Sequence, residues 1–260
     1  MDSFMLILSA LDATFRIATP LILCAMAGIF AERSGIVDIS LEGKLLTGAF
    51  AAAAVAALTG SAWLGLFAAM CAGLIMSLIH GFATITHRGD QVVSGVAINI
   101  LASGLTVILG IALFSQGGQT PTLPSDARFR PIEWLGADAI GSVPLLGAVY
   151  RDLISGHNLL VYLALLAVPL AAFVLYRTRF GLRLRAVGEV PEAVDSAGIS
   201  VPWLRYRALI IGGLLCGIAG AYLSIAAGSN FVREMSAGKG YIALAAVIFG
   251  NWRPVTAFLA

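Results

Sequence analysis

The side chains able to bind a polar molecule are concentrated in a few stretches of a chain that is otherwise mostly apolar. In one stretch, Asp38, Ser40 and Glu42 follow one another at alternate positions. Carboxylates and hydroxyls of this kind accept hydrogen bonds, and the hydroxyl also donates one. We therefore take these three residues as candidates for contacting a polar solute.

The composition indicates a membrane protein. Of the 260 residues, 59% are hydrophobic and only 12% are charged, whereas soluble domains carry about 25% charged residues. The three cysteines lie in apolar runs without paired spacing, and neither an acid–base pair nor a cluster of metal ligands is visible. We predict an all-α integral membrane protein, a polytopic helical bundle, and we expect no catalytic residue, no disulfide and no metal site.

A polar helix face is predicted by Gln91, Gly95, Asn99 and Ser103, which recur every fourth residue. Polar groups inside a bilayer face the bundle or a cavity and not lipid. Asn99 costs the most to bury, so it is the first candidate for contacting a transported solute, with Gln91 and Ser103 on the same face. The alternative, hydrogen bonding between helices, stays open.

The uncharged runs predict about seven spans in a single transmembrane domain. Residues 1–16 carry three charges among apolar residues and are expected to form an interfacial helix. The remaining parts are a first repeat (17–115), a proline-rich external loop (116–156), a linking span (157–177), a cytoplasmic loop (178–206) and a second repeat (207–260).

The first span is predicted to be broken. Ile17 to Ala31 contains 15 uncharged residues, about 22 Å of helix, whereas the hydrocarbon core is about 30 Å thick. The span must borrow length from the polar residues that follow, and a break at membrane depth is tolerated only beside protein or a water-filled cavity. The alternative is an ordinary cytoplasmic loop between two short helices.

The stretch from Arg177 to Arg207 is the most charged part of the chain, and its arginines crowd two membrane boundaries. A short loop with this many arginines stays in the cytoplasm. Within it, Pro191 suits a first helical position, Glu192 suits the first turn and Gly198 suits a left-handed stop. The interpretations left open are a solvated loop that only fixes topology and a docking helix for a cytoplasmic partner.

Two further patterns concern packing and symmetry. A stripe of small residues, Gly212, Cys216, Gly220, Ser224 and Gly228, is expected to let helices approach closely.

Residues 29–52 and 230–254 follow the same order: an apolar run, a polar break, a Gly-Lys pair and an apolar helix. The number of spans between them places the two copies in opposed orientations, which predicts an inverted repeat. The second copy is then incomplete, and we expect two further spans, about 45 residues, beyond Ala260.

Four stretches resemble one family. GEVPEAVDSAGI is similar to the coupling loop of ABC-importer permeases, with Val194 where a second alanine is usual. ERSGIVDISLEG resembles the signature of permeases for nucleosides and simple sugars, with Asp38 where many relatives carry asparagine. QVVSGVAINILASGL and NFVREMSAGKGYIALAAVIFGNWRP are also family-like. The resemblance covers nearly the whole chain, is strongest to the nucleoside or purine branch, and implies the fold type of the vitamin B12 and ribose permeases.

The resemblance implies a membrane subunit of a bacterial ABC importer in the cell membrane, working with other subunits. A cytoplasmic ATPase would dock on residues 188–198, and the implied coupling residues are Gly188, Pro191, Glu192, Ala193, Asp195 and Gly198. The chain has no glycine-rich phosphate loop, so ATP and Mg²⁺ are expected on that partner and no cofactor on this chain. A second permease subunit and an extracytoplasmic binding protein are also implied, and no nucleic acid.

A different class of function is an ion-coupled secondary transporter for a small polar solute. Such a protein needs ionisable groups within its spans. The uncharged runs offer only His80, His157 and the acids of residues 32–42 for that purpose.

Overall fold

The computed structural model describes residues 2–132 and 155–260. Its secondary structure there is helical apart from turns, bends and two isolated β-bridges. The helices are α1 (Asp2–Glu32), α2 (Leu41–Thr59), α3 (Ala62–Gly81), α4 (Gln91–Phe114), α7 (Leu159–Arg177), α8 (Arg179–Glu189), α9 (Pro191–Ser196), α10 (Val201–Ala221), α11 (Lys239–Phe249) and α12 (Pro254–Leu259). Two π-helical segments, η1 (Phe82–Thr86) and η4 (Tyr222–Ala227), extend α3 and α10, and η2 (Ser125–Ala127) is a 3₁₀ turn.

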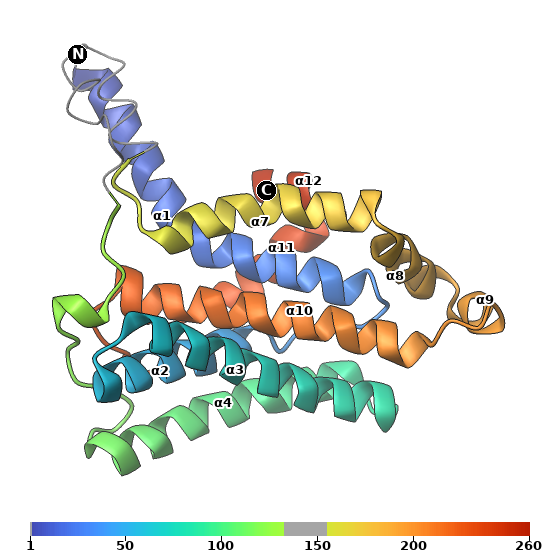
Figure 1. Ribbon diagram of the computed structural model, residues 1–260, viewed down its shortest axis with the longest axis horizontal. Helices are drawn as coiled ribbons and strands as arrows, with labels where there is room; N and C mark the ends of the chain where they lie inside the picture. Colours follow the sequence, from blue (N-terminus) through green and yellow to red (C-terminus); the bar gives the residue numbers. More distant parts are fainter. Residues whose placement is uncertain (1, 133–154) are drawn as a thin grey trace.

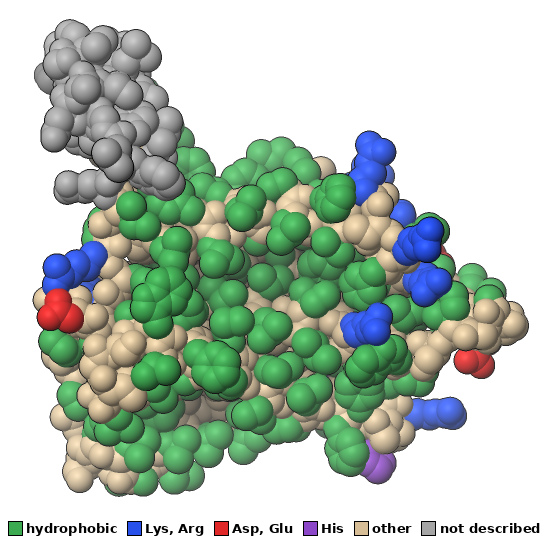
Figure 2. All heavy atoms as spheres, viewed as in Figure 1, with side chains coloured by type: hydrophobic (Ala, Val, Ile, Leu, Met, Phe, Trp, Pro, Cys, Tyr) green, Lys and Arg blue, Asp and Glu red, His purple; other side chains and the backbone are tan. Residues whose placement is uncertain are grey.

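The bundle confirms an all-helical polytopic membrane fold. Within the described ranges, six helices are long and apolar enough to cross a membrane, compared with the seven or so predicted. The difference is α11, which has only 11 residues, about 16 Å at the standard rise. On the face that Figure 2 shows, Lys and Arg side chains gather at the two ends and apolar side chains cover the region between them.

The predicted separation of residues 1–16 from the first span is wrong. Residues 2–32 form one helix, α1, and its first turns extend beyond the body of the bundle (Figure 1). The helix continues through residues 2–32 although Pro20 lies inside it, so neither the scattered charges nor this proline ends it before Glu32. An interfacial position for its first turns stays a prediction.

The chain breaks twice, and the two breaks enter the bundle from opposite ends. The first break, residues 33–40, follows α1 at the end of the bundle that carries α8 and α9. The second break, residues 228–238, follows η4 at the other end (Figure 1). This opposed arrangement agrees with the predicted inverted repeat. The first break lies after a full-length helix, however, so the prediction that it interrupts a short first span is wrong.

Close approach of backbones places α10 at the centre of the bundle. Gly212 faces Ala27 of α1, and a Cβ added at Gly220 would overlap the backbone of Gly48 and Ala49 in α2. On the other side of the same helix, a Cβ at Gly217 would overlap Ala69 of α3. The predicted packing role is confirmed for Gly212 and Gly220. Glycine is needed at position 220 because no side chain fits between the helices there, whereas at Gly212 an added Cβ would lie 3.3 Å from Ala27 O.

The arginine-rich segment is mostly helical and not a loop. α8 and α9 occupy residues 179–196, and α10 begins at Val201, inside the segment predicted as cytoplasmic loop 178–206. The predicted short helix is confirmed, because α9 starts at Pro191 and Gly198 adopts a φ of +76° just after it.

The predicted external loop 116–156 is described only at its edges, since residues 133–154 lie outside the described part. Its first part runs along the second break, where Thr120 N donates to Phe231 O at 3.2 Å and Leu123 N donates to Ser229 O at 2.7 Å. These bonds place residues 116–132 at the end of the bundle opposite α8 and α9.

Replacing Gly220 by alanine is expected to destabilise the bundle, because the added methyl group overlaps α2, and overpacking of this kind costs about 1–3 kcal/mol. Thermal unfolding in detergent should show a lower midpoint. Gly104→Ala is the matched control, since Gly104 is exposed on α4 with no atom within 4 Å of the added methyl group. Equal midpoints for the two variants would contradict the packing assigned to Gly220.

Candidate functional site

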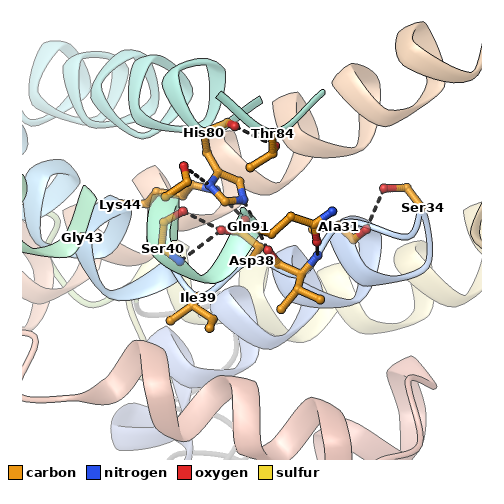
Figure 3. A network of polar contacts seen from close by, with 12 residues as sticks. Ala31, Ser34, Asp38, Ile39, Ser40, Gly43, Lys44, His80, Thr84 and Gln91 are labelled. Carbon is orange, nitrogen blue, oxygen red and sulfur yellow. Dashed lines mark hydrogen bonds and ion pairs between the residues drawn. The ribbon is translucent and has the colours of Figure 1, made fainter. Parts of the chain in front are cut away.

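The first break is held by a buried ion pair. Lys44 Nζ bonds to Asp38 Oδ2, and both side chains are fully enclosed, with 0% exposure. The other carboxylate oxygen of Asp38 accepts bonds from Ser40 Oγ at 2.5 Å and from Ser40 N at 3.2 Å (Figure 3). Asp38 and Ser40 therefore fix the irregular backbone that leads into α2, and they have no free group facing a cavity.

Residues of α3 and α4 bind the same break. His80 Nε2 lies 3.3 Å from the carbonyl oxygen of Val37, and its Nδ1 lies 3.0 Å from Ser94 Oγ (Figure 3). Gln91 Oε1 accepts a hydrogen bond from Val37 N at 2.7 Å. The unpaired backbone of the break is thus satisfied by side chains, as membrane depth requires.

Glu42 joins the two breaks. Its Oε1 accepts a bond from Gly238 N at 2.8 Å and its Oε2 accepts one from Gly240 N at 2.6 Å. These N–H groups stand at the start of α11, where the helix dipole favours a negative charge. A Cβ at Gly240 would overlap the backbone of Glu42, so the first turns of α2 and α11 are in direct contact.

Asn99 ties α4 to both broken regions. Its Oδ1 accepts from Gly43 N at 2.8 Å, and its Nδ2 donates to Ile39 O at 3.0 Å and to Tyr241 Oη at 2.9 Å. The hydrogen-bonding role left open from the sequence is therefore present. A place for Asn99 on the translocation route stays a prediction.

Most of the predicted pathway residues lie close together, and Ser103 lies apart from the others. Five of them surround the first break and the start of α11: Asp38, Ser40, Glu42, Gln91 and Asn99. Ser103 lies one turn farther along α4, where its hydroxyl donates to the exposed carboxylate of Glu234. The residues around this region that were not predicted as site residues are Lys44, Glu234 and Tyr241, and His80 was considered only as an ionisable group for ion coupling. Lys44 was detectable, because a lysine entering an uncharged run of this length needs a buried partner.

Four of the predicted coupling residues, Pro191, Glu192, Ala193 and Asp195, lie on the short helix α9, which has one buried anchor. Val194 packs with Val187 and Leu204 and is 7% exposed. The side chains of Glu192, Ala193 and Asp195 are exposed. The valine that departs from the family pattern is therefore the residue that attaches α9, and an apolar groove runs between α8 and α9.

The end of α8 touches the first break. A Cβ at Gly188 would overlap the carbonyl oxygen of Arg33, and Arg205 Nε donates to Ser34 O at 3.2 Å. Backbone contact of this closeness joins α8 directly to the first break. The exposed helix α9 is therefore linked, through α8 and α10, to the turn where α1 ends.

Replacing Lys44 by methionine is expected to leave Asp38 buried without its partner. Removing one member of a buried ion pair costs about 3–5 kcal/mol, whereas removing both charges is often nearly neutral. The yield of folded protein and its thermal midpoint in detergent should fall for Lys44→Met and recover in the double variant Lys44→Met/Asp38→Asn. A single variant as stable as the unaltered chain would show that the pair does not hold the break.

Comparisons with known proteins identify the family of this chain. Residues 10–260 match the family described as "Branched-chain amino acid transport system / permease component". The guanosine ABC transporter permease protein NupQ of Bacillus subtilis is 39% identical, over 99% of this chain and 80% of the relative. The nucleoside ABC transporter permease protein NupC of Lactococcus lactis is 36% identical, over 94% of this chain and 75% of the relative.

An archaeal protein is similar too: the putative glucose ABC transporter permease protein TsgC13 of Haloferax volcanii is 38% identical, over 94% of this chain and 71% of the relative. No solved structure matches the chain significantly. The family match over nearly the whole chain, with six apolar helices and two opposed breaks, shows that this multi-pass membrane protein belongs to the branched-chain amino acid type of ABC transporter permeases.

Proposed function

We propose that the chain is the permease subunit of an ATP-driven importer for nucleosides, with simple sugars as the second substrate class. The relatives named for guanosine and nucleosides support the first class, and the relative named for glucose supports the second. The observation that carries the proposal is the contact between α8 and the first break, because it connects a cytoplasmic docking helix to the interior of the bundle.

A separate ATPase subunit docks on α8 and α9. The exposed face of α9 offers Glu192, Ala193 and Asp195, and the groove beside it is lined by the apolar Leu182, Val190 and Ile199. An apolar groove with charged residues at its rim suits a protein partner. ATP and Mg²⁺ belong to that partner.

Movement of the docked unit reaches the pathway through rigid contacts. Gly188 presses on the turn at Arg33, and Glu42 links the first break to the second. A shift of α8 and α9 would therefore move both breaks together. This is rigid-body switching between two access states, which is the usual form of alternating access.

Two further partners complete the importer. A second permease subunit would cover the exposed helices of the bundle. An extracytoplasmic binding protein would deliver substrate at the end formed by residues 116–132.

An ion-coupled transporter is the weaker candidate. It needs ionisable groups that can exchange an ion within the spans. The charges around the first break are instead engaged with one another or with backbone N–H groups, as Asp38 is with Lys44 and Glu42 is with α11.

Replacing Gly198 by valine is expected to reduce uptake, because a β-branched residue is strained at a φ of +76°. The strain, about 1 kcal/mol or more, would disorder the end of α9 and weaken ATPase docking. The measurements are guanosine uptake and co-purification of the ATPase from cells that express the complete transporter.

Gly198→Asn is the matched control, since asparagine tolerates the left-handed conformation. No atom lies within 4 Å of a Cβ at this position, so the two variants differ in backbone strain and not in steric overlap. Normal uptake by Gly198→Val would remove the coupling role proposed for this residue.

A further inference from the structure

A charged group lies at mid-depth on the outer side of α4. This helix is the least buried of the six candidate spans, with 22% of its apolar window buried. Ser103, at the middle of the helix, donates its hydroxyl to Oε1 of Glu234, which comes from the second break. Both side chains meet on an exposed part of the surface, about halfway between the two ends of the span.

The carboxylate of Glu234 cannot face lipid at this depth. The helices α4 and α11 carry apolar side chains that are also exposed, among them Ile100 at 69% and Ile242 at 54%. A carboxylate at such a depth faces protein or a water-filled cavity. Within the described residues, Oε2 of Glu234 accepts no hydrogen bond, unlike the two oxygens of Glu42, which both bind backbone N–H groups.

The backbone at Glu234 is strained and held in place. Glu234 has a φ of +56° and Ala237 a φ of +47°, a region that residues with a side chain seldom adopt. Before them, Phe231 is fully buried against Phe50, and after them Gly238 is bound by Glu42. The chain is thus anchored on both sides of an exposed carboxylate, an arrangement typical of binding sites.

Tyr241 supplies a complementary group beside it. Its hydroxyl oxygen accepts from Asn99, so its own proton is available to a ligand, and its side chain is 47% exposed. Asn99 and Ser103 are one helical turn apart, about 6 Å along the axis. A hydrogen-bond acceptor and an aromatic donor therefore stand side by side on the same face.

We propose that Glu234 and Tyr241 contact the transported molecule and select a neutral solute that carries hydroxyl groups. This inference rests on the proposed function and specifies which chemistry its pathway accepts. The carboxylate accepts hydrogen bonds from sugar hydroxyls, the tyrosine donates one, and its ring offers a flat surface to a base. A phosphate group is rejected, because two negative charges repel strongly where water is scarce.

The first test measures uptake of guanosine and of 2′,3′-dideoxyguanosine by the complete transporter. The unaltered complex should prefer the hydroxyl-bearing compound. Glu234→Gln should raise the KM for guanosine at least tenfold and narrow that preference, while ATPase co-purification stays normal. Ser103→Ala removes the hydroxyl that binds the carboxylate but keeps the carboxylate itself. This variant should also raise the KM for guanosine and narrow the preference for guanosine, but by less than Glu234→Gln. An unchanged KM and preference in Glu234→Gln would overturn the inference.

The second test separates this inference from the proposed function, because it needs no transport. Glu234→Cys is labelled in the assembled complex with a polar, membrane-impermeant thiol reagent, and the labelling of the unaltered chain is subtracted. Reaction in at least one nucleotide state is expected. A cysteine that stays unreactive in every nucleotide state would overturn the site. Labelling of the cysteine variant, combined with no ATP-driven uptake of nucleosides or sugars by the unaltered complex, would instead refute the proposed function.

Discussion

The bond between Glu42 and the first turn of α11 is the interaction on which the rest of the bundle depends. Two helices are interrupted inside an apolar bundle, which exposes backbone groups that lipid cannot satisfy. One carboxylate serves two of these N–H groups and joins both interruptions. Without it, α11 would begin in an apolar environment with two unpaired donors.

The surroundings of this bond are arranged so that each charge has its own partner. Lys44 compensates Asp38 within the first break, and the dipole of α11 compensates Glu42. Glycines on α10 let the neighbouring helices close around this region without side chains between the backbones. The polar groups inside the bundle therefore hold the two breaks in place. Ser103 and Glu234 differ from them, because this pair is exposed on the surface.

The sequence predicts those features that local chemistry decides. Pro191 and Gly198 mark the two ends of α9, and the polar residues after Ala31 mark the position of the first break. Contacts between distant residues were not predictable, because no local pattern pairs Glu42 with Gly240, 198 positions later. The prediction of a separate helix at residues 1–16 was wrong, because α1 continues through the scattered charges and through Pro20 to Glu32.

The distance in sequence between Glu42 and Gly240 has a consequence for biosynthesis. A ribosome adds about 5–20 residues per second, so the carboxylate at the start of α2 waits about 10–40 s before its two donors are made. During that time its hydrogen bonds must come from water or from other parts of the nascent chain. The first break therefore cannot settle into its native position while the first spans are being inserted, and it remains at the membrane surface or within the insertion machinery until the second repeat arrives.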